Sequence, residues 1–298
     1  FGGILIYPFN GLAFIVLLIK IFTLIRNSKT ESINRLVYIF VFFIATLLLI
    51  VQINSPQPDV ICAILIIYSI IQFIELDARM PINNFLLLAG LVFLTITFKL
   101  SSLFLALLLL PVLVKSFSWK TFFSLVGIGV VIILPFHIRN YYLSGYLIYP
   151  FPALDLFDVD WKIPLRYVQI EKWKVETWAR LPHVPFSEVL EKSISEWFPM
   201  WFSVKTSIQQ AILVICALTP ITLMVLIWKK KHKLLIVQSI LLFNLLFWFY
   251  QAPNFRFALG FFFMSTAITV GLVLYLLSVE KLLRKAFVLE FVIILLLG

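Results

Sequence analysis

The chain has 298 residues, of which 62% are hydrophobic and 13% are charged, and its formal net charge is +10. Soluble domains carry about 45–50% apolar and about 25% charged residues, so this composition excludes a water-soluble fold and a disordered chain. Apolar runs close to the length of a membrane span recur along the whole chain, which indicates a polytopic membrane protein.

Ten apolar segments are expected to be helices, because an isolated strand cannot satisfy its backbone hydrogen bonds in lipid. In chain order they span residues 4–25, 35–53, 60–76, 84–98, 100–117, 120–138, 207–228, 234–250, 255–278 and 286–298. The fourth and fifth meet at Lys99 and are interpreted as a broken pair or a tight hairpin. The predicted fold class is therefore all-α: a polytopic transmembrane helical bundle with a long outer-face loop that carries interfacial helices.

The charged residues predict an orientation. If the loops between these segments alternate between the two sides of the membrane, the loops on one side carry fourteen cations and four acids. Their difference equals the whole net charge of +10. The cations are Lys20, Arg26, Lys29, Arg35, Arg79, Lys115, Lys120, Lys229, Lys230, Lys231, Lys233, Lys281, Arg284 and Lys285. By the positive-inside rule this side is cytoplasmic. Since the cations are spread over separate loops, the lipid bilayer is the expected partner and nucleic acid is not.

We expect an integral protein of the bacterial inner membrane, with residues 139–206 on the non-cytoplasmic side. The predicted division is 1–138 for N-terminal membrane helices, 139–206 for the outer interfacial segment and 207–298 for C-terminal membrane helices. Because the chain begins at Phe1 and its last apolar run is short, both ends are expected to be truncated.

The outer segment is predicted to lie on the membrane surface. Residues 163–180 and 188–198 are expected to form helices. Its tryptophans are expected at headgroup level, although they are also of a kind that stacks on sugars; they are Trp161, Trp173, Trp178, Trp197 and Trp201.

Four lone charges flank the apolar segments on the predicted outer side. Asp59 is either a helix-starting residue favoured by the helix dipole or an outward-facing carboxylate. Lys99 either snorkels to the interface, pairs with Asp59 or binds an anion. Arg139 has a planar guanidinium suited to phosphate or carboxylate, and is otherwise an ordinary interfacial arginine. With Arg256, these residues are hypothesised to open into one pocket.

Two further sets of residues have a structural and a functional interpretation. His137 is either a hydrogen-bonded structural histidine or a base. Asp155, Asp158 and Asp160 offer oxygen ligands, so a divalent cation is a candidate cofactor, but the full calcium-loop pattern is missing and turn or helix-cap roles are the alternative.

Residues 136–150, with Arg139–Asn140, Ser144–Gly145 and Tyr149–Pro150, resemble a passage of the GT-C type membrane glycosyltransferases. Residues 97–102 resemble the lysine-centred break of those enzymes, and residues 149–199 resemble a poorly characterised family of bacterial polytopic membrane proteins. The likeness extends over residues 35–260.

The resemblance implies transfer of a sugar from a polyprenyl-phosphate donor to an unknown acceptor at the outer membrane face. It places Asp59 at the second acidic position of the family, with the main catalytic base upstream of Phe1. It places Lys99, Arg139 and Arg256 near the lipid phosphate. The candidates for substrate binding are His137, Asn140, Tyr149, Asp155 and Trp161.

Two other functions fit the same sequence. A lipid or solute transporter or flippase also needs charges near membrane depth and broken helices. A non-catalytic subunit of polysaccharide or cell-envelope assembly is the third hypothesis.

Overall fold

A computed structural model describes residues 2–27, 29–52, 58–76, 82–115, 117–152 and 155–280. Over these ranges the chain is helical and contains no β-strand, as predicted. The expected apolar segment at 286–298 lies outside the described residues. The chain forms two compact units: unit 1 comprises Phe1–Glu75, Ile212–Leu242 and Leu259–Gly298, and unit 2 comprises Leu76–Ala211 and Phe243–Ala258.

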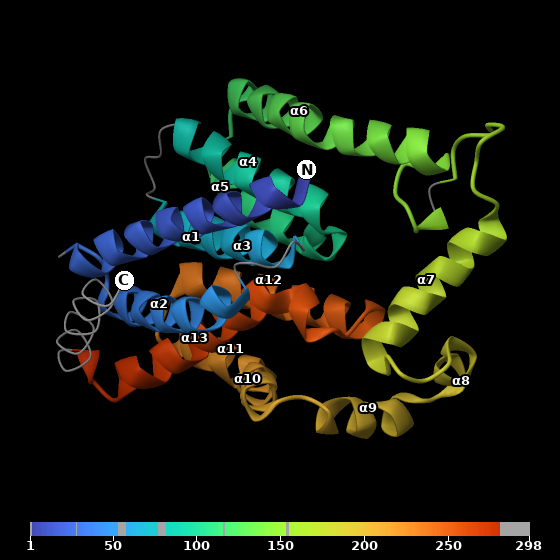
Figure 1. The fold of residues 1–298 in the computed structure, drawn as a ribbon. Coiled ribbons are helices and arrows are strands. Elements are labelled where there is room, and N and C mark those ends of the chain that lie inside the picture. The colour runs from blue at the N-terminus through green and yellow to red at the C-terminus, as the bar shows by residue number, and fades with distance from the viewer. Residues whose placement is uncertain are drawn as a thin grey trace. The chain divides into compact units, whose positions relative to one another are not determined.

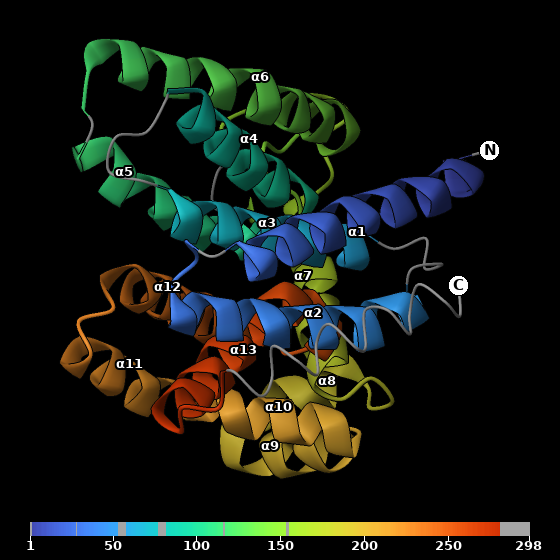
Figure 2. The same ribbon diagram turned by 90° about the vertical axis from the view of Figure 1, so that its left-hand side faces the viewer.

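Unit 1 is a bundle of apolar helices (Figures 1 and 2). Its members are α1 (Gly2–Arg26), α2 (Ser32–Gln52), α3 (Asp59–Glu75), α11 (Thr219–Trp228) and α13 (Leu259–Leu276). Two more helices, α10 (Ser207–Ala217) and α12 (His232–Gln251), each have one end in unit 1 and the other in unit 2. Every residue of α13 from Leu259 to Thr269 is buried, which makes α13 the central helix of this unit.

Small residues let α13 approach its neighbours closely. A Cβ atom on Gly260 would lie 3.0 Å from the Cα atom of Ala63 in α3, and one on Gly271 would lie 3.0 Å from the backbone nitrogen of Val37 in α2. Such close backbone approach is typical of helix packing in membranes, where helices gain nothing from excluding water.

Buried polar side chains connect α11, α12 and α13. Gln238 donates through Nε2 to the hydroxyl oxygens of Thr219 at 3.3 Å and Ser265 at 3.1 Å, and all three residues are fully buried. One turn further on, Thr222 and Thr269 share a hydrogen bond at 3.1 Å. These bonds satisfy polar groups that would otherwise be stranded in an apolar interior.

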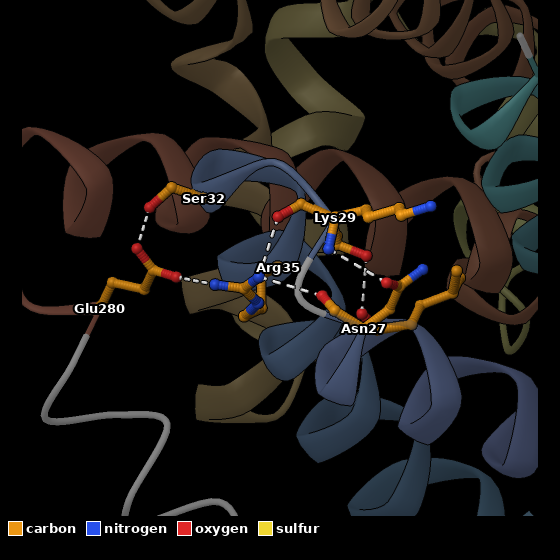
Figure 3. Close-up of polar contacts among 7 residues, drawn as sticks. Asn27, Lys29, Ser32, Arg35 and Glu280 are labelled. Carbon is orange, nitrogen blue, oxygen red and sulfur yellow. Dashed lines mark hydrogen bonds and ion pairs between the residues drawn. The ribbon is translucent and has the colours of Figure 1, made fainter.

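One end of unit 1 carries a set of polar contacts between helix ends. Arg35, at the start of α2, forms an ion pair with Glu280 and donates to the carbonyl oxygens of Asn27 at 3.1 Å and Thr30 at 2.9 Å (Figure 3). Glu31 pairs with Lys231 across the loops that precede α2 and α12. The loops before α2 and before α12 and the residues after α13 therefore lie together at one end of this unit.

Unit 2 places α4 (Ile82–Phe98) against α6 (Trp119–Ser144) (Figures 1 and 2). In the sequence, η1 (Leu100–Leu108) and α5 (Leu109–Lys115) follow α4 and pack back along it. The break at Lys99 is therefore a hairpin. Lys99 itself has extended backbone angles, φ −153° and ψ 109°. The unit also contains α7 (Leu165–Arg180), α8 (Phe186–Glu191), α9 (Ile194–Ser203) and η3 (Phe255–Ala258).

Three helix boundaries differ from those expected. The helix predicted to end at residue 138 passes through Pro135 and continues as α6 to Ser144, because no glycine or proline follows residue 138 until Gly145, which ends it with a φ of +79°. The helix predicted over 188–198 is two helices, because Ser193 and Glu196 form a capping box that starts α9. The segment at 207–228 bends by 44° between α10 and α11, where Pro220 begins the second helix.

Four helices within the described ranges are long and apolar enough to cross a membrane, or five if α10 and α11 count as one bent span. The four are Phe9–Arg26, Trp119–Ser144, His232–Gln251 and Phe255–Leu276. Shorter apolar helices occur at Ser32–Leu47, Ile82–Phe98 and Leu100–Lys115. These features are those of a helical membrane protein.

Candidate functional site

Unit 2 contains every candidate site residue except Asp59. Asp59 belongs to unit 1, where it is the buried first residue of α3, directly after Pro58. The proline fixes the backbone just before the helix begins, and the carboxylate lies at the positive end of the helix dipole.

Lys99 and Arg256 lie side by side in unit 2. The Lys99 ammonium donates to the carbonyl oxygen of Arg256 at 3.4 Å and lies 4.7 Å from the centre of the Phe257 ring. The Arg256 guanidinium lies 5.4 Å from the same ring and 5.1 Å from the ring of Trp178. Two cations thus share one aromatic side chain, which attracts positive charge through the negative face of its ring.

Two cavities adjoin this pair of cations, and Phe257 and Val175 line both. The first, of about 360 Å³, is mostly apolar and is called the Lys99 cavity here. Its lining includes Phe98, Lys99, Phe136, Tyr149, Phe151 and Phe247. The second, of about 520 Å³, is called the Arg256 cavity, and its polar lining includes Glu171, Lys174, Thr177, Trp178 and Arg256.

Glu171 is a carboxylate that the sequence analysis did not select. Glu171 lines the Arg256 cavity and also interacts with Tyr149, which lines the Lys99 cavity. Two effects raise the pKa of the Tyr149 hydroxyl: burial is the larger, and the negative charge of Glu171 is the smaller. Its position on one face of α7 can be recognised in the sequence. Glu171, Lys174, Val175 and Trp178 recur at the three- and four-residue spacing of one helix face, and all four line the Arg256 cavity.

The loop that carries Arg256 is fixed by tryptophans. Trp201, which is 1% exposed, donates through its indole nitrogen to the carbonyl oxygen of Pro253 at 2.7 Å. Trp248 donates in the same way to the carbonyl oxygen of Asn254 at 2.7 Å. These bonds hold the backbone directly before η3, so they set the position of Arg256.

Other predicted residues have structural partners. His137 Nδ1 and Asn140 Nδ2 both lie within hydrogen-bond distance of the Leu147 carbonyl oxygen, at 3.0 and 3.1 Å, and so stabilise the turn after α6. Arg139 is exposed on α6 and lines neither cavity. The structure therefore brings together Lys99 and Arg256, and with them Tyr149.

The acidic segment after Tyr149 makes its contacts with neighbouring residues of the chain. Asp155 forms an ion pair with Lys162, and Trp161 packs edge-on against Tyr141 with ring centres 5.9 Å apart. Among the described residues, no three histidine, cysteine, aspartate or glutamate side chains are grouped as a metal ion would require.

Residues 4–263 match a family described as a domain of unknown function (DUF8201). The chain belongs to the DUF8201 family. Neither a curated protein nor a solved structure matches this DUF8201 chain. The match spans both cations, both cavities and nearly all of the described helices.

Replacing Trp201 by phenylalanine in the DUF8201 chain is expected to lower the free energy of unfolding by about 1 kcal/mol, because the buried Pro253 carbonyl loses its donor. Denaturant unfolding of the purified protein measures this. Trp228→Phe is the matched control, since Trp228 is 71% exposed and should tolerate the change. Equal effects of the two substitutions would contradict the role given to Trp201.

Replacing Glu171 by glutamine in the DUF8201 chain is expected to lower the pKa of Tyr149 towards its usual value of about 10, because one of the two causes that raise it is removed. The tyrosinate absorbance of each protein, minus that of its Tyr149→Phe counterpart, isolates this titration. Glu176→Gln on the same helix is the control and should leave it unchanged. An identical titration in the parent and in Glu171→Gln would show that the two side chains do not interact.

Proposed function

We propose that the protein is a membrane glycosyltransferase of the GT-C type, which uses a polyprenyl-phosphate-linked sugar at the outer face of the bacterial inner membrane. The observation that carries the proposal is the pairing of Lys99 and Arg256 at Phe257, where the Lys99 cavity adjoins the Arg256 cavity, whose lining combines apolar side chains with polar and charged ones. A polyprenyl-phosphate sugar joins an apolar chain, an anionic phosphate and a sugar ring, and that ring has both apolar and polar faces.

The parts of the donor are assigned to the site by their chemistry. The aromatic lining of the Lys99 cavity suits the first isoprene units, and the two cations suit the phosphate. Trp178 and Thr177 in the Arg256 cavity suit a sugar, since an aromatic face packs on the apolar face of a sugar ring and a hydroxyl bonds its oxygens.

The reaction that follows from this placement is a direct displacement. Glu171 takes the proton from the acceptor hydroxyl, whose oxygen forms a bond to the anomeric carbon of the sugar. The bond between that carbon and the phosphate oxygen breaks, and the electron pair leaves with the polyprenyl phosphate. Lys99 and Arg256 stabilise the charge that develops on this leaving group. This proposal gives Glu171 the role of base that the family resemblance assigns upstream of Phe1, and it assigns no step to Asp59, which belongs to unit 1.

The ten-segment topology belongs to the same proposal. It places the basic loops of unit 1 in the cytoplasm, and Lys99, Arg256 and residues 139–206 on the opposite side. The uneven distribution of charge supports this orientation, as does the collection of those basic loops at one end of unit 1.

Turnover in proteoliposomes tests the proposal. The protein is reconstituted with undecaprenyl-phosphate-linked sugars and with membrane extract as the source of acceptors, with and without a chelator. Release of undecaprenyl phosphate that depends on the protein is expected. Movement of the intact donor between leaflets without its cleavage would indicate the flippase hypothesis instead, and the absence of both would indicate an assembly subunit.

A further inference from the structure

A basic pocket lies at the polar end of unit 1, separate from the two cavities of unit 2. It has a volume of about 290 Å³ and is lined by Glu31, Asn34, Ile74, Lys230, Lys231, His232, Lys233 and Leu234. Three lysines against one glutamate give this pocket a net positive charge. Glu31 is engaged by Lys231, and the Lys233 ammonium donates to the Ile74 carbonyl oxygen at 2.7 Å.

Lys230 holds a backbone conformation that lysine rarely adopts. Its φ is +56°, at the turn after α11 where glycine is usual, and the amide of Lys231 donates to the carbonyl oxygen of Leu226 at 3.0 Å to close that turn. The lysine therefore costs backbone stability relative to glycine, yet it puts a cation into the pocket lining.

An exposed apolar stripe on α11 ends at Trp228, two residues before Lys230, the first lysine of the basic pocket. Ile221 is 60% exposed, Met224 is 68% exposed and Trp228 is 71% exposed, and their spacing of three and four residues puts them on one face. Trp228 adjoins Lys229, whose ammonium lies 4.1 Å from the centre of the Trp228 ring. Tryptophan next to lysine at the end of an apolar helix is typical of the level of lipid headgroups.

We propose that the basic pocket binds the phosphate of an anionic phospholipid whose acyl chains lie along the α11 stripe. A basic pocket between membrane helices recognises the negative charge of such a headgroup, and the adjoining stripe selects a lipid over a free phosphate ion. This site is independent of glycosyl transfer, since it uses only residues of unit 1.

Native mass spectrometry of the detergent-solubilised protein tests this site. Dioleoylphosphatidylglycerol is titrated against dioleoylphosphatidylcholine in the parent protein and in Lys230→Gly. The glycine variant suits the left-handed turn, so it should fold at least as stably as the parent. Its affinity for phosphatidylglycerol should fall about fivefold, and its affinity for phosphatidylcholine should not change.

Two controls keep the result specific. Lys115→Gln removes the same charge from another loop of the predicted basic face and should preserve binding. Inorganic phosphate and glycerophosphoglycerol, which lack acyl chains, should not displace the lipid at equal concentration. Equal losses in Lys230→Gly and Lys115→Gln, no preference for phosphatidylglycerol in the parent, or displacement by either chain-free phosphate would each overturn the proposal.

Discussion

Replacing Lys99 by alanine is expected to lower the affinity for undecaprenyl phosphate by about thirtyfold, with a parallel loss of any sugar transfer. The substitution removes one of the two cations assigned to the phosphate, and loss of a charge-assisted hydrogen bond to the phosphate costs about 2 kcal/mol. Binding of radiolabelled undecaprenyl phosphate to the protein in nanodiscs measures the loss. Arg256→Ala should have an effect of similar size.

The matched control for Lys99→Ala is Lys192→Ala. Lys192 lies in the outer segment, between α8 and α9, on the side of the membrane predicted for Lys99, and it lines neither cavity. Its removal tests whether the loss of any cation on the predicted outer side weakens binding. If Lys192→Ala weakens binding as much as Lys99→Ala, the phosphate is not held at the pair of cations.

Replacing Gly260 by alanine is expected to destabilise the protein by about 1–3 kcal/mol. The added Cβ atom would lie 2.8 Å from the Cβ atom of Ile66 and 3.0 Å from both the Cα atom and the carbonyl oxygen of Ala63. Because these are backbone or backbone-proximal atoms, the clash is relieved only by moving α13 away from α3. The midpoint of unfolding in a denaturing detergent measures the change.

Gly11→Ala in α1 is the control for the same chemical change. No atom lies within 4 Å of the Cβ position on Gly11. Alanine there gains helix propensity of about 1 kcal/mol, so the two substitutions should shift the midpoint in opposite directions. Shifts of the same sign would show that helix propensity, and not the approach of α13 to α3, controls the outcome.

Composition and periodicity predict the helical architecture because a long apolar segment in lipid has few alternatives. They also predict the break at Lys99, where a charge and two serines interrupt an apolar run, and the structure confirms it as a hairpin. They do not predict the exact helix ends at Ser144, Glu191 and Ala217. Those ends depend on a left-handed glycine, a capping box and a proline, each of which acts over only a few residues.

Local sequence patterns cannot predict the contact between Lys99 and Arg256, because 157 positions separate the two residues in the sequence. The sequence identifies both residues as lone cations on the predicted outer side, but it does not predict that they are in contact. The sequence places Glu171 on one face of α7 with Lys174 and Trp178, but this helix carries several other charges, so the cavity is needed to single out Glu171. Asn140 was selected as a substrate ligand because a polar group beside an apolar helix has the same sequence signature whether it binds a substrate or a backbone carbonyl.

The most direct measurement is the through-space coupling between the phosphorus of undecaprenyl phosphate and the lysine side-chain nitrogens. Protein labelled with ¹⁵N-lysine is reconstituted in bilayers of a phosphorus-free glycolipid, so that undecaprenyl phosphate is the source of the phosphorus signal, and is studied by solid-state NMR. We expect one lysine signal to be dephased by phosphorus, and that dephasing to disappear in Lys99→Arg, which removes the labelled nitrogen but keeps the charge. Dephasing that persists unchanged in Lys99→Arg would place the phosphate elsewhere and contradict the site.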